Sequence, residues 1–213
     1  MAMDISKMRK DYKMETLREG DVKADPLDQF RLWFEEALKA EVPEPNAMTL
    51  ATCSANAKPS ARIVLLKGVI ESGFIFFTNY DSRKGIEIAS NPLASLVFLW
   101  HELERQVRVD GAIEKISREE SASYFYSRPF QSQVSALVSP QSKVIQGKDA
   151  LEQLHAEKTA LYSNNTVPFP ENWGGYLVKP EVIEFWQGRS SRFHDRICYK
   201  REFGNWKIER LAP

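Results

Sequence analysis

The sequence has few of the residues from which disulfide scaffolds and metal centres are built. Among 213 residues there are two cysteines and three histidines, and no CxxC pair or Cys/His ligand spacing occurs. Cys53 and Cys198 each lie in a stretch that is typical of a strand. We therefore interpret both as small buried side chains in a reducing compartment, and we expect no metal site.

Long apolar runs and an excess of charge of either sign are also missing. No run approaches the length of a membrane span, and the opening "MAMDISKMRKDYKMETL" lacks the apolar centre of a secretory signal. Lys and Arg together number 29, as do Asp and Glu, so the formal net charge is zero. This balance does not favour binding to nucleic acid or to an anionic membrane, and we expect a cytoplasmic protein. Any basic cluster must be local, which favours small anions.

The hydrophobic pattern predicts a mainly β chain with inserted helices, of the α+β class. Residues 1–24 are polar and weakly periodic, which predicts a mobile N-terminal arm, and residues 25–213 are expected to form a single domain. From residue 47 the hydrophobic period changes to two. The resulting strand predictions are 47–54, 60–69, 73–79, 93–100, 105–116, 174–188, 193–201 and 205–213. Hairpins without βαβ alternation favour an antiparallel closed or split barrel.

Capping signals mark the starts of three predicted helices. Asp25 can cap a helix over 25–42, with Pro26 at its first position. Ser82 can cap a short helix that ends before Asn91-Pro92, and Ser117 begins a capping box at the start of a helix over 117–127. Further helices are expected at 131–139 and 148–163.

The stretch "YDSRKG" places Arg83 and Lys84 in the first turn of the helix that Ser82 caps. Cations at this end oppose the helix dipole and normally cost stability. An anion bound there would reverse that cost, because free N–H groups and two cations would converge on it. A solvated basic turn is an equally good interpretation of this stretch alone.

Other polar residues are ambiguous when taken singly. In "ARIVLLKG", Arg62 and Lys67 face opposite sides of a strand, and Lys67 could simply end that strand in water. Tyr124 and Arg128 are four residues apart on one helix face, with Ser132 just beyond, a set that suits a phosphate but also a core tyrosine and a solvated helix end. The remaining ambiguous side chains are Gln106, Gln141 and Ser142.

The segment "EFWQGRSSRFHDR" contains an unusual row of charge. Alternation along a strand would place Arg192, His194 and Arg196 on one face, with Phe193 on the other. Three such groups in a row repel one another unless an anionic or aromatic ligand lies among them, and arginine stacks well on flat rings.

These pieces together resemble the pyridoxine (pyridoxamine) 5′-phosphate oxidase family. The matching motifs are "RIVLLK", "FFTNYDSRKG", "LERQVRV-G", "YFYSRP", "VSPQS", "WGGY-V-P--IEFWQG", "R-HDR" and "WKIERLAP", in order along residues 47–213. No single motif is specific, but the combination is. Phe193 is a small departure, because leucine is usual at its position.

The resemblance implies a split β-barrel of the FMN-binding type, with antiparallel Greek-key strands, assembled as a homodimer that holds FMN between subunits. It implies flavin contacts from Arg62, Ile63, Val64, Leu65, Leu66, Lys67, Phe77, Thr78, Arg83, Lys84, Gln106, Gln141, Ser142, Trp186 and Arg196. Within this set, Arg83 and Lys84 would hold the flavin phosphate.

The resemblance also implies a substrate site and a reaction. Substrate contacts are expected from Arg9, Lys10, Asp11, Tyr12, Lys67, Tyr124, Arg128, Ser132, Arg192, Phe193 and His194. Arg192 and His194 would be the catalytic residues beside the pyridine ring, and Arg9–Tyr12 would close over the substrate as a lid. The expected reaction is oxidation of pyridoxine 5′-phosphate or pyridoxamine 5′-phosphate to pyridoxal 5′-phosphate by FMN, with O2 as acceptor and H2O2 as product.

Three other functions stay open at this point. A flavin reductase on the same barrel would keep the flavin-phosphate residues but would lack "SRP" and "R-HDR". A flavin- or pyridoxal-phosphate-binding protein without catalysis would bind without turnover. A barrel for single-stranded nucleic acid would combine aromatic residues with a basic groove, which the zero net charge disfavours.

Overall fold

The computed structural model describes residues 11–12 and 14–213, and these form two compact units. The terminal unit contains the described residues up to Thr49 together with Ser95–Asp110 and Pro180–Pro213. The central unit contains Leu50–Ala94 and Gly111–Lys179. The single domain expected over residues 25–213 stays a prediction.

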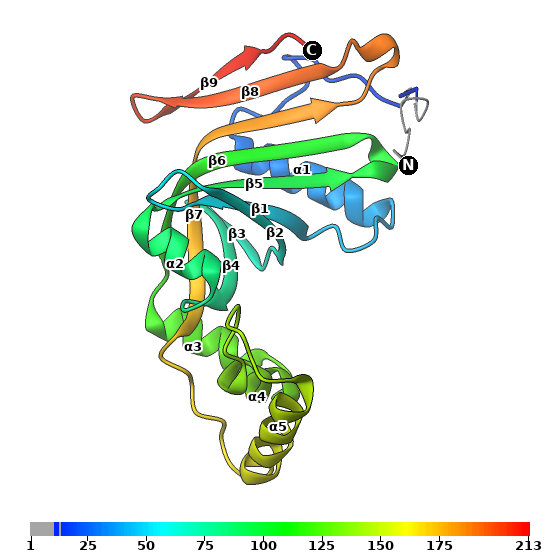
Figure 1. Cartoon of the computed structure of the whole chain (residues 1–213). Coiled ribbons are helices and arrows are strands. Elements are labelled where there is room, and N and C mark those ends of the chain that lie inside the picture. The colour runs from blue at the N-terminus through cyan, green and yellow to red at the C-terminus, as the bar shows by residue number, and fades with distance from the viewer. Residues whose placement is uncertain (1–10, 13) are drawn as a thin grey trace, which may run out of the picture. The chain divides into compact units, whose positions relative to one another are not determined.

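Nine strands of the described chain form one sheet (Figure 1). They are β1 (Ala47–Cys53), β2 (Pro59–Leu65), β3 (Gly68–Ile70), β4 (Gly73–Asn79), β5 (Leu93–Trp100), β6 (Arg105–Lys115), β7 (Trp173–Gln187), β8 (Asp195–Glu202) and β9 (Asn205–Arg210). The strand order is β2-β1-β5-β6-β7-β4-β3, while β8 pairs with both β7 and β9. The pairs β3–β4, β4–β7, β7–β8 and β8–β9 are all antiparallel, as the hairpin pattern predicts.

The helices are α1 (Pro26–Lys39), α2 (Arg83–Ser90), α3 (Arg118–Ser127), α4 (Phe130–Val138) and α5 (Lys148–Tyr162), with short 3-10 turns at His101–Leu103 and Ser190–Arg192. The three predicted caps are confirmed. Asp25 accepts from the amide of Leu27, Ser82 accepts from the amide of Gly85, and the capping box of Ser117 is complete. No helix in the described ranges is long and apolar enough to cross a membrane.

The single strand predicted over 60–69 is wrong, because two strands occupy that stretch. Strand β2 neighbours β1, whereas β3 pairs with β4. The chain changes neighbours at Leu66, which is buried, and the amide of Lys67 already donates to the carbonyl of Ile75 in β4, at 2.8 Å. The break therefore presents the Lys67 side chain at the end of β2.

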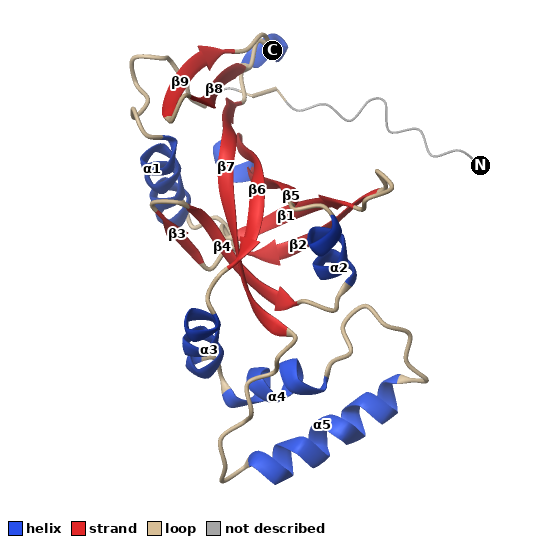
Figure 2. Cartoon of the chain, turned by 90° about the vertical axis from the view of Figure 1, so that its left-hand side faces the viewer, coloured by secondary structure: helices blue, strands red, loops and turns tan. Residues whose placement is uncertain are grey.

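Each unit has its own aromatic core. In the terminal unit, α1 packs Phe30 against Phe98 with ring centroids 4.9 Å apart, and Trp33 against Phe185 at 5.1 Å. In the central unit, Phe125 of α3 and Val134 of α4 are buried in one cluster with Val167 and Trp173. Helices α4 and α5 lie alongside each other, joined by a hydrogen-bond contact between Ser135 and His155 (Figure 2).

Candidate functional site

The central unit contains a cavity of about 340 Å³ between β2, β4, α2 and the segment that follows α3. Every lining residue except Trp173 was predicted to contact flavin or substrate, and those contacts stay predictions. The lining residues are Arg62, Ile63, Val64, Leu65, Lys67, Phe77, Thr78, Lys84, Tyr124, Arg128, Gln141 and Trp173. Residues from distant parts of this unit thus meet around one space of a size that suits a small ligand.

Lys84 places a buried positive charge in this cavity. Its ammonium donates to the Gln141 side chain at 2.9 Å, and to the hydroxyls of Thr78 and Ser82 at 3.2 Å each. Burial lowers the pKa of Lys84, and the nearby charge of Arg62 lowers it further. Because these three partners are uncharged, an anion in the cavity would be the natural counter-charge.

Arg128 is a second cation of the cavity lining, and one of its nitrogens lacks a hydrogen-bond acceptor among the described residues. It caps the C-terminal end of α3, and its guanidinium lies 4.7 Å from the ring centroid of Trp173. Its Nη1 is buried and has no hydrogen-bond partner among the described residues, and burial lowers the pKa of the group. A buried donor without an acceptor costs stability, so this nitrogen is suited to a ligand oxygen.

Aromatic rings complete the wall near Arg128. The ring of Tyr124 stacks on that of Phe77 with centroids 3.8 Å apart, and Phe77 in turn stacks on Trp173 at 5.5 Å. Trp173 was not anticipated from the sequence, because it is separated from Arg128 by two helices and a loop. Its indole face supports the guanidinium by a cation–π contact.

Several predicted residues lie outside this cavity lining. Arg83 is largely exposed and donates from Nε to Glu87 at 2.9 Å. Leu66 is buried in the core, and Ser132 lies in the first turn of α4. Ser142 adjoins the lining residue Gln141 and has a positive φ of 70°.

In the terminal unit the structure brings Trp186, His194 and Tyr12 together. Their ring centroids are 4.7 Å (Trp186–His194), 5.7 Å (Tyr12–Trp186) and 5.8 Å (Tyr12–His194) apart. The Nδ1 atom of His194 accepts from the amide of Arg189 at 3.1 Å, which leaves the proton of a neutral ring on Nε2. Gly188 makes room for Tyr12, because a Cβ atom at Gly188 would stand 2.8 Å from Cγ of the tyrosine.

The predicted single strand face for Arg192, His194 and Arg196 is wrong. Ser190–Arg192 form a 3-10 turn in which Ser191 and Arg192 have positive φ angles of 55° and 62°, and β8 begins only at Asp195. Period-two alternation does not apply before that point. Arg192 and Phe193 are exposed, and of the three predicted residues only Arg196 lies in β8.

A carboxylate, rather than a ligand, compensates the charge of Arg196. Its guanidinium binds the buried Glu184 through two hydrogen bonds, of 2.8 and 3.0 Å, and donates to the carbonyl of Ala212 at 2.8 Å. Sequence reasoning missed Glu184 because its contact with Arg196 depends on the β7–β8 register, in which Arg196 stands opposite Trp186. The predicted flavin residue Gln106 is half-buried in β6.

Hydrogen bonds join the N-terminal segment to Asp195, the first residue of β8, and to Arg210 of β9. The amide of Leu17 donates to Asp195 at 3.1 Å, and its carbonyl accepts from Arg210 at 2.8 Å. Arg210 also forms two hydrogen bonds with Glu19, which lower the pKa of that carboxyl to about 2. Of the predicted lid, Asp11 and Tyr12 are described, whereas Arg9 and Lys10 lie outside the described residues.

Comparisons with known proteins identify the family. Residues 34–161 match the family model described as pyridoxamine 5′-phosphate oxidase, and residues 173–213 match the pyridoxine 5′-phosphate oxidase C-terminal dimerisation region. The chain belongs to the pyridoxine/pyridoxamine 5′-phosphate oxidase family. The resemblance found in the sequence motifs is thereby confirmed.

Curated relatives of this family match along the whole chain. The pyridoxine/pyridoxamine 5′-phosphate oxidase of Acaryochloris marina is 54% identical over 209 residues, covering 98% of this chain and 95% of the relative. That of a Cyanothece species is 52% identical over 213 residues and covers both chains completely.

Solved structures agree on the fold. PhzG from Burkholderia lata 383, in complex with tetrahydrophenazine-1-carboxylic acid, has a TM-score of 0.89 at 29% identity, covering 94% of this chain and 100% of that one. An FMN-binding protein related to pyridoxamine 5′-phosphate oxidase from Nostoc punctiforme has a TM-score of 0.69 at 18% identity, covering 86% and 97%. The prediction of a mixed α+β fold of the split-barrel type is confirmed.

Proposed function

We propose that this family member oxidises pyridoxine 5′-phosphate and pyridoxamine 5′-phosphate to pyridoxal 5′-phosphate, with FMN as cofactor, dioxygen as electron acceptor and hydrogen peroxide as product. The observation that carries the proposal is that Arg128 lines a ligand-sized cavity while its buried Nη1 has no hydrogen-bond partner among the described residues. A phosphate oxygen would supply the missing acceptor.

The donors around the central cavity fit the two phosphate groups that this reaction requires. Arg128 would bind the substrate phosphate, together with Lys67, Tyr124 and Ser132. At the N-terminus of α2, Lys84 and Arg83 would bind the phosphate of FMN, where the helix dipole also favours an anion. The strand residues 62–67, with Phe77, Thr78, Gln141 and Ser142, would line the flavin.

The aromatic cluster of the terminal unit supplies the proposed ring contacts. Arg192 and His194 would flank the pyridine ring of the substrate, and Phe193, Asp11 and Tyr12 would lie beside it. The proton on Nε2 of His194 is available for donation to the C4′ substituent, because Nδ1 is occupied by the Arg189 amide. Gln106, Trp186 and Arg196 would complete the flavin site. FMN, when bound, supplies the hydride acceptor.

We further propose that the chain works as a cytoplasmic homodimer with FMN at the subunit interface. The support is the match of residues 173–213 to a family region described as a dimerisation region. In size-exclusion chromatography with light scattering, a mass of twice 24.5 kDa is expected. A purely monomeric holoprotein would contradict this part of the proposal.

The activity is tested by oxygen consumption. Purified protein is mixed with FMN and then with pyridoxine 5′-phosphate or pyridoxamine 5′-phosphate, while dissolved oxygen, hydrogen peroxide and pyridoxal 5′-phosphate are measured. We expect peroxide and aldehyde in equal amounts, and no oxygen consumption with unphosphorylated pyridoxine at the same concentration. A protein that binds FMN but turns over neither phosphorylated substrate would instead be a flavin-binding protein.

A further inference from the structure

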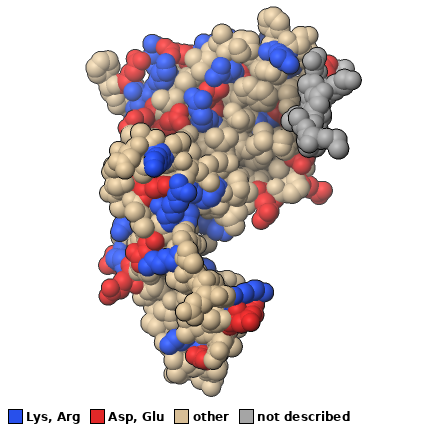
Figure 3. All heavy atoms as spheres, in the orientation of Figure 1, with Lys and Arg blue, Asp and Glu red and all other residues tan. Residues whose placement is uncertain are grey.

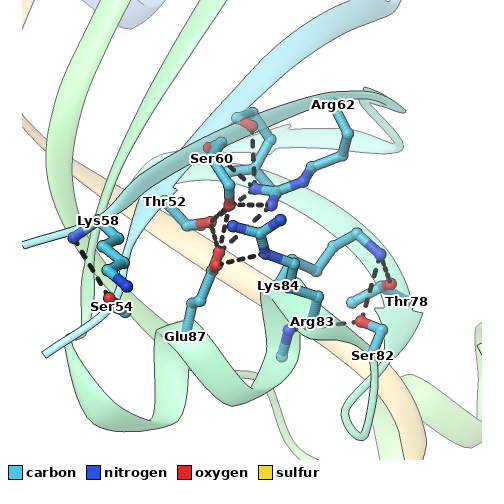
Figure 4. Close-up of polar contacts among 12 residues, drawn as sticks. Thr52, Ser54, Lys58, Ser60, Arg62, Thr78, Ser82, Arg83, Lys84 and Glu87 are labelled. Atoms are coloured by element: carbon cyan, nitrogen blue, oxygen red, sulfur yellow. Dashed lines mark hydrogen bonds and ion pairs between the residues drawn. The ribbon is translucent and has the colours of Figure 1, made fainter. Parts of the chain in front are cut away.

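A buried carboxylate that the proposed reaction does not use lies beside the cavity. Glu87 projects from α2 toward β1 and β2, and its side chain is only 7% exposed (Figure 4). Its Oε2 accepts hydrogen bonds from Ser60 at 2.5 Å and from Thr52 at 2.6 Å, and its Oε1 accepts from Nε of Arg83 at 2.9 Å. It is not among the residues that line the cavity.

The same carboxylate contacts Arg62, which does line the cavity. One guanidinium nitrogen of Arg62 lies 3.3 Å from Oε2 of Glu87 and bonds the hydroxyl of Ser60. The other bonds the Thr52 hydroxyl at 2.6 Å and the Leu50 carbonyl at 3.2 Å. The hydroxyls of Thr52 and Ser60 therefore bridge the carboxylate to the guanidinium, which fixes the rotamer of Arg62 at the cavity wall.

The concentration of positive charge near the N-terminus of α2 explains why a carboxylate is buried there. Arg62, Arg83 and Lys84 gather near the N-terminus of α2, where the helix dipole is also positive. The partners of Lys84 are neutral, so Glu87 carries the negative charge in this network. Burial opposes ionisation of Glu87, yet the hydrogen bonds from Ser60, Thr52, Arg83 and Arg62 lower its pKa to about 2. The carboxylate is therefore ionised at every physiological pH.

We propose that Glu87 is a positioning residue for the FMN site, which acts by holding the guanidinium of Arg62 against the cavity. This inference rests on the proposed function, because it takes FMN to be the ligand. Two effects of removing the carboxylate oppose each other. Losing a negative charge near a phosphate site would tighten FMN binding, because it removes a Coulomb repulsion. Losing the orientation of Arg62 would weaken FMN binding. Since two guanidinium groups already compensate the charge of Glu87, orientation dominates.

The sign of the change in FMN affinity is therefore the test. Apoprotein is titrated with FMN, flavin fluorescence reports the dissociation constant, and thermal unfolding confirms that each variant is folded at the titration temperature. Glu87→Gln should weaken FMN binding about tenfold, the loss expected for one charge-assisted hydrogen bond. Glu114→Gln is the matched control, because Glu114 also forms an ion pair in this unit, with Lys179 at 2.7 Å, and does not line the cavity. Its affinity should equal that of the wild type.

A double-mutant cycle separates positioning from a general loss of stability. In an Arg62→Gln background, Glu87→Gln should change FMN affinity by less than about twofold, because the residue through which it acts is already gone. A general structural effect would give the same tenfold loss in both backgrounds and would overturn the proposal. Unchanged or tighter FMN binding by Glu87→Gln alone would also overturn it.

A second variant keeps the test decisive if Glu87→Gln does not fold. Thr52→Val removes the hydroxyl that bridges Glu87 and Arg62 while it retains every charge, so FMN binding should weaken roughly threefold. Wild-type affinity in a folded Thr52→Val protein would count against positioning. A wild-type protein that binds no FMN would instead contradict the proposed function, so the two failures are distinguishable.

Discussion

Two cations that line the cavity of the central unit differ from three arginines of the terminal unit in what compensates their charge. In the terminal unit, Arg105 binds Glu36 and Glu15, Arg196 binds Glu184, and Arg210 binds Glu19 and Asp195. In the cavity of the central unit, Lys84 has neutral partners and Arg128 has a buried nitrogen without one among the described residues.

The difference in charge compensation indicates where an anion can bind. A cation without a counter-charge gains more from a bound anion than a guanidinium whose charge a carboxylate already compensates. Basic and acidic side chains are intermingled over the visible surface (Figure 3), so clusters of charge alone do not distinguish the two cases.

The largest expected effect concerns Arg192, which differs from the paired arginines of the terminal unit. Arg192 is exposed and has no ion pair in the described part of the chain, so its charge is available to the substrate. Arg192→Leu should lower turnover by about 100-fold while FMN remains bound, because the ring would lose its orientation. Steady-state kinetics and the flavin spectrum measure both quantities. Arg201→Leu, an exposed arginine over Trp206, is the control, and wild-type turnover in Arg192→Leu would contradict the assigned role.

The next effect compares two arginines of the central unit that contact Trp173, Arg128 at its ring and Arg118 at its carbonyl. Arg128→Met should raise KM for pyridoxine 5′-phosphate about 30-fold without loss of stability, since its buried nitrogen is unbonded before substrate arrives. Arg118 donates to the carbonyls of Trp173 and Pro170, at 2.8 and 3.1 Å. Arg118→Met should therefore lower the unfolding temperature and leave KM unchanged. The opposite assignment of the two losses would refute this distinction.

A smaller effect concerns the paired arginine of the terminal unit. Arg196→Met should lower the free energy of unfolding by about 2 kcal/mol, because the buried Glu184 loses both hydrogen bonds from Arg196 and keeps the ion pair with Arg108 at 3.2 Å. Urea denaturation of the apoprotein measures this change. Lys200→Met is the matched control on the same strand, since solvent screens the Lys200–Glu209 ion pair and its loss should change stability far less. Equal losses in the two variants would contradict the importance of burial.

The smallest predicted effect is a pH dependence in the central unit. The pKa of Glu87 is depressed from 4.5 to about 2 in the folded protein, so its contribution to stability is present above 4.5 and is lost as the pH falls toward 2. Between pH 5 and pH 4 the wild type should lose about 0.7 kcal/mol more of its unfolding free energy than Glu87→Gln. Parallel urea midpoints at both pH values would show that the carboxylate is not stabilised in this way.

Local signals in the sequence predicted most of the fold. The caps at Asp25, Ser82 and Ser117 depend on neighbours within three residues, and the period-two strands depend on alternation, so both can be read from a single chain. The prediction failed at Ser191 and Arg192, because alternation was extended through residues with positive φ that no glycine marked.

The family motifs had named most of the residues that line the candidate cavity, but not the residues that support them. Glu87 follows Arg83 by four residues, a spacing that could have predicted their ion pair. Nothing local could have predicted the contacts of Glu87 with Thr52 and Ser60, or that of Trp173 with Arg128, since these depend on how separate elements pack.

The hydrogen bonds of Arg210 with Leu17 and Glu19 couple the two ends of the chain. Terminal segments usually open first and independently. Here the guanidinium of a residue close to the C-terminus closes a non-covalent ring with the N-terminal segment, and Asp195 completes it through the Leu17 amide. Opening at one end therefore exposes the other, and shortening the chain from Arg210 would release both segments in a single step.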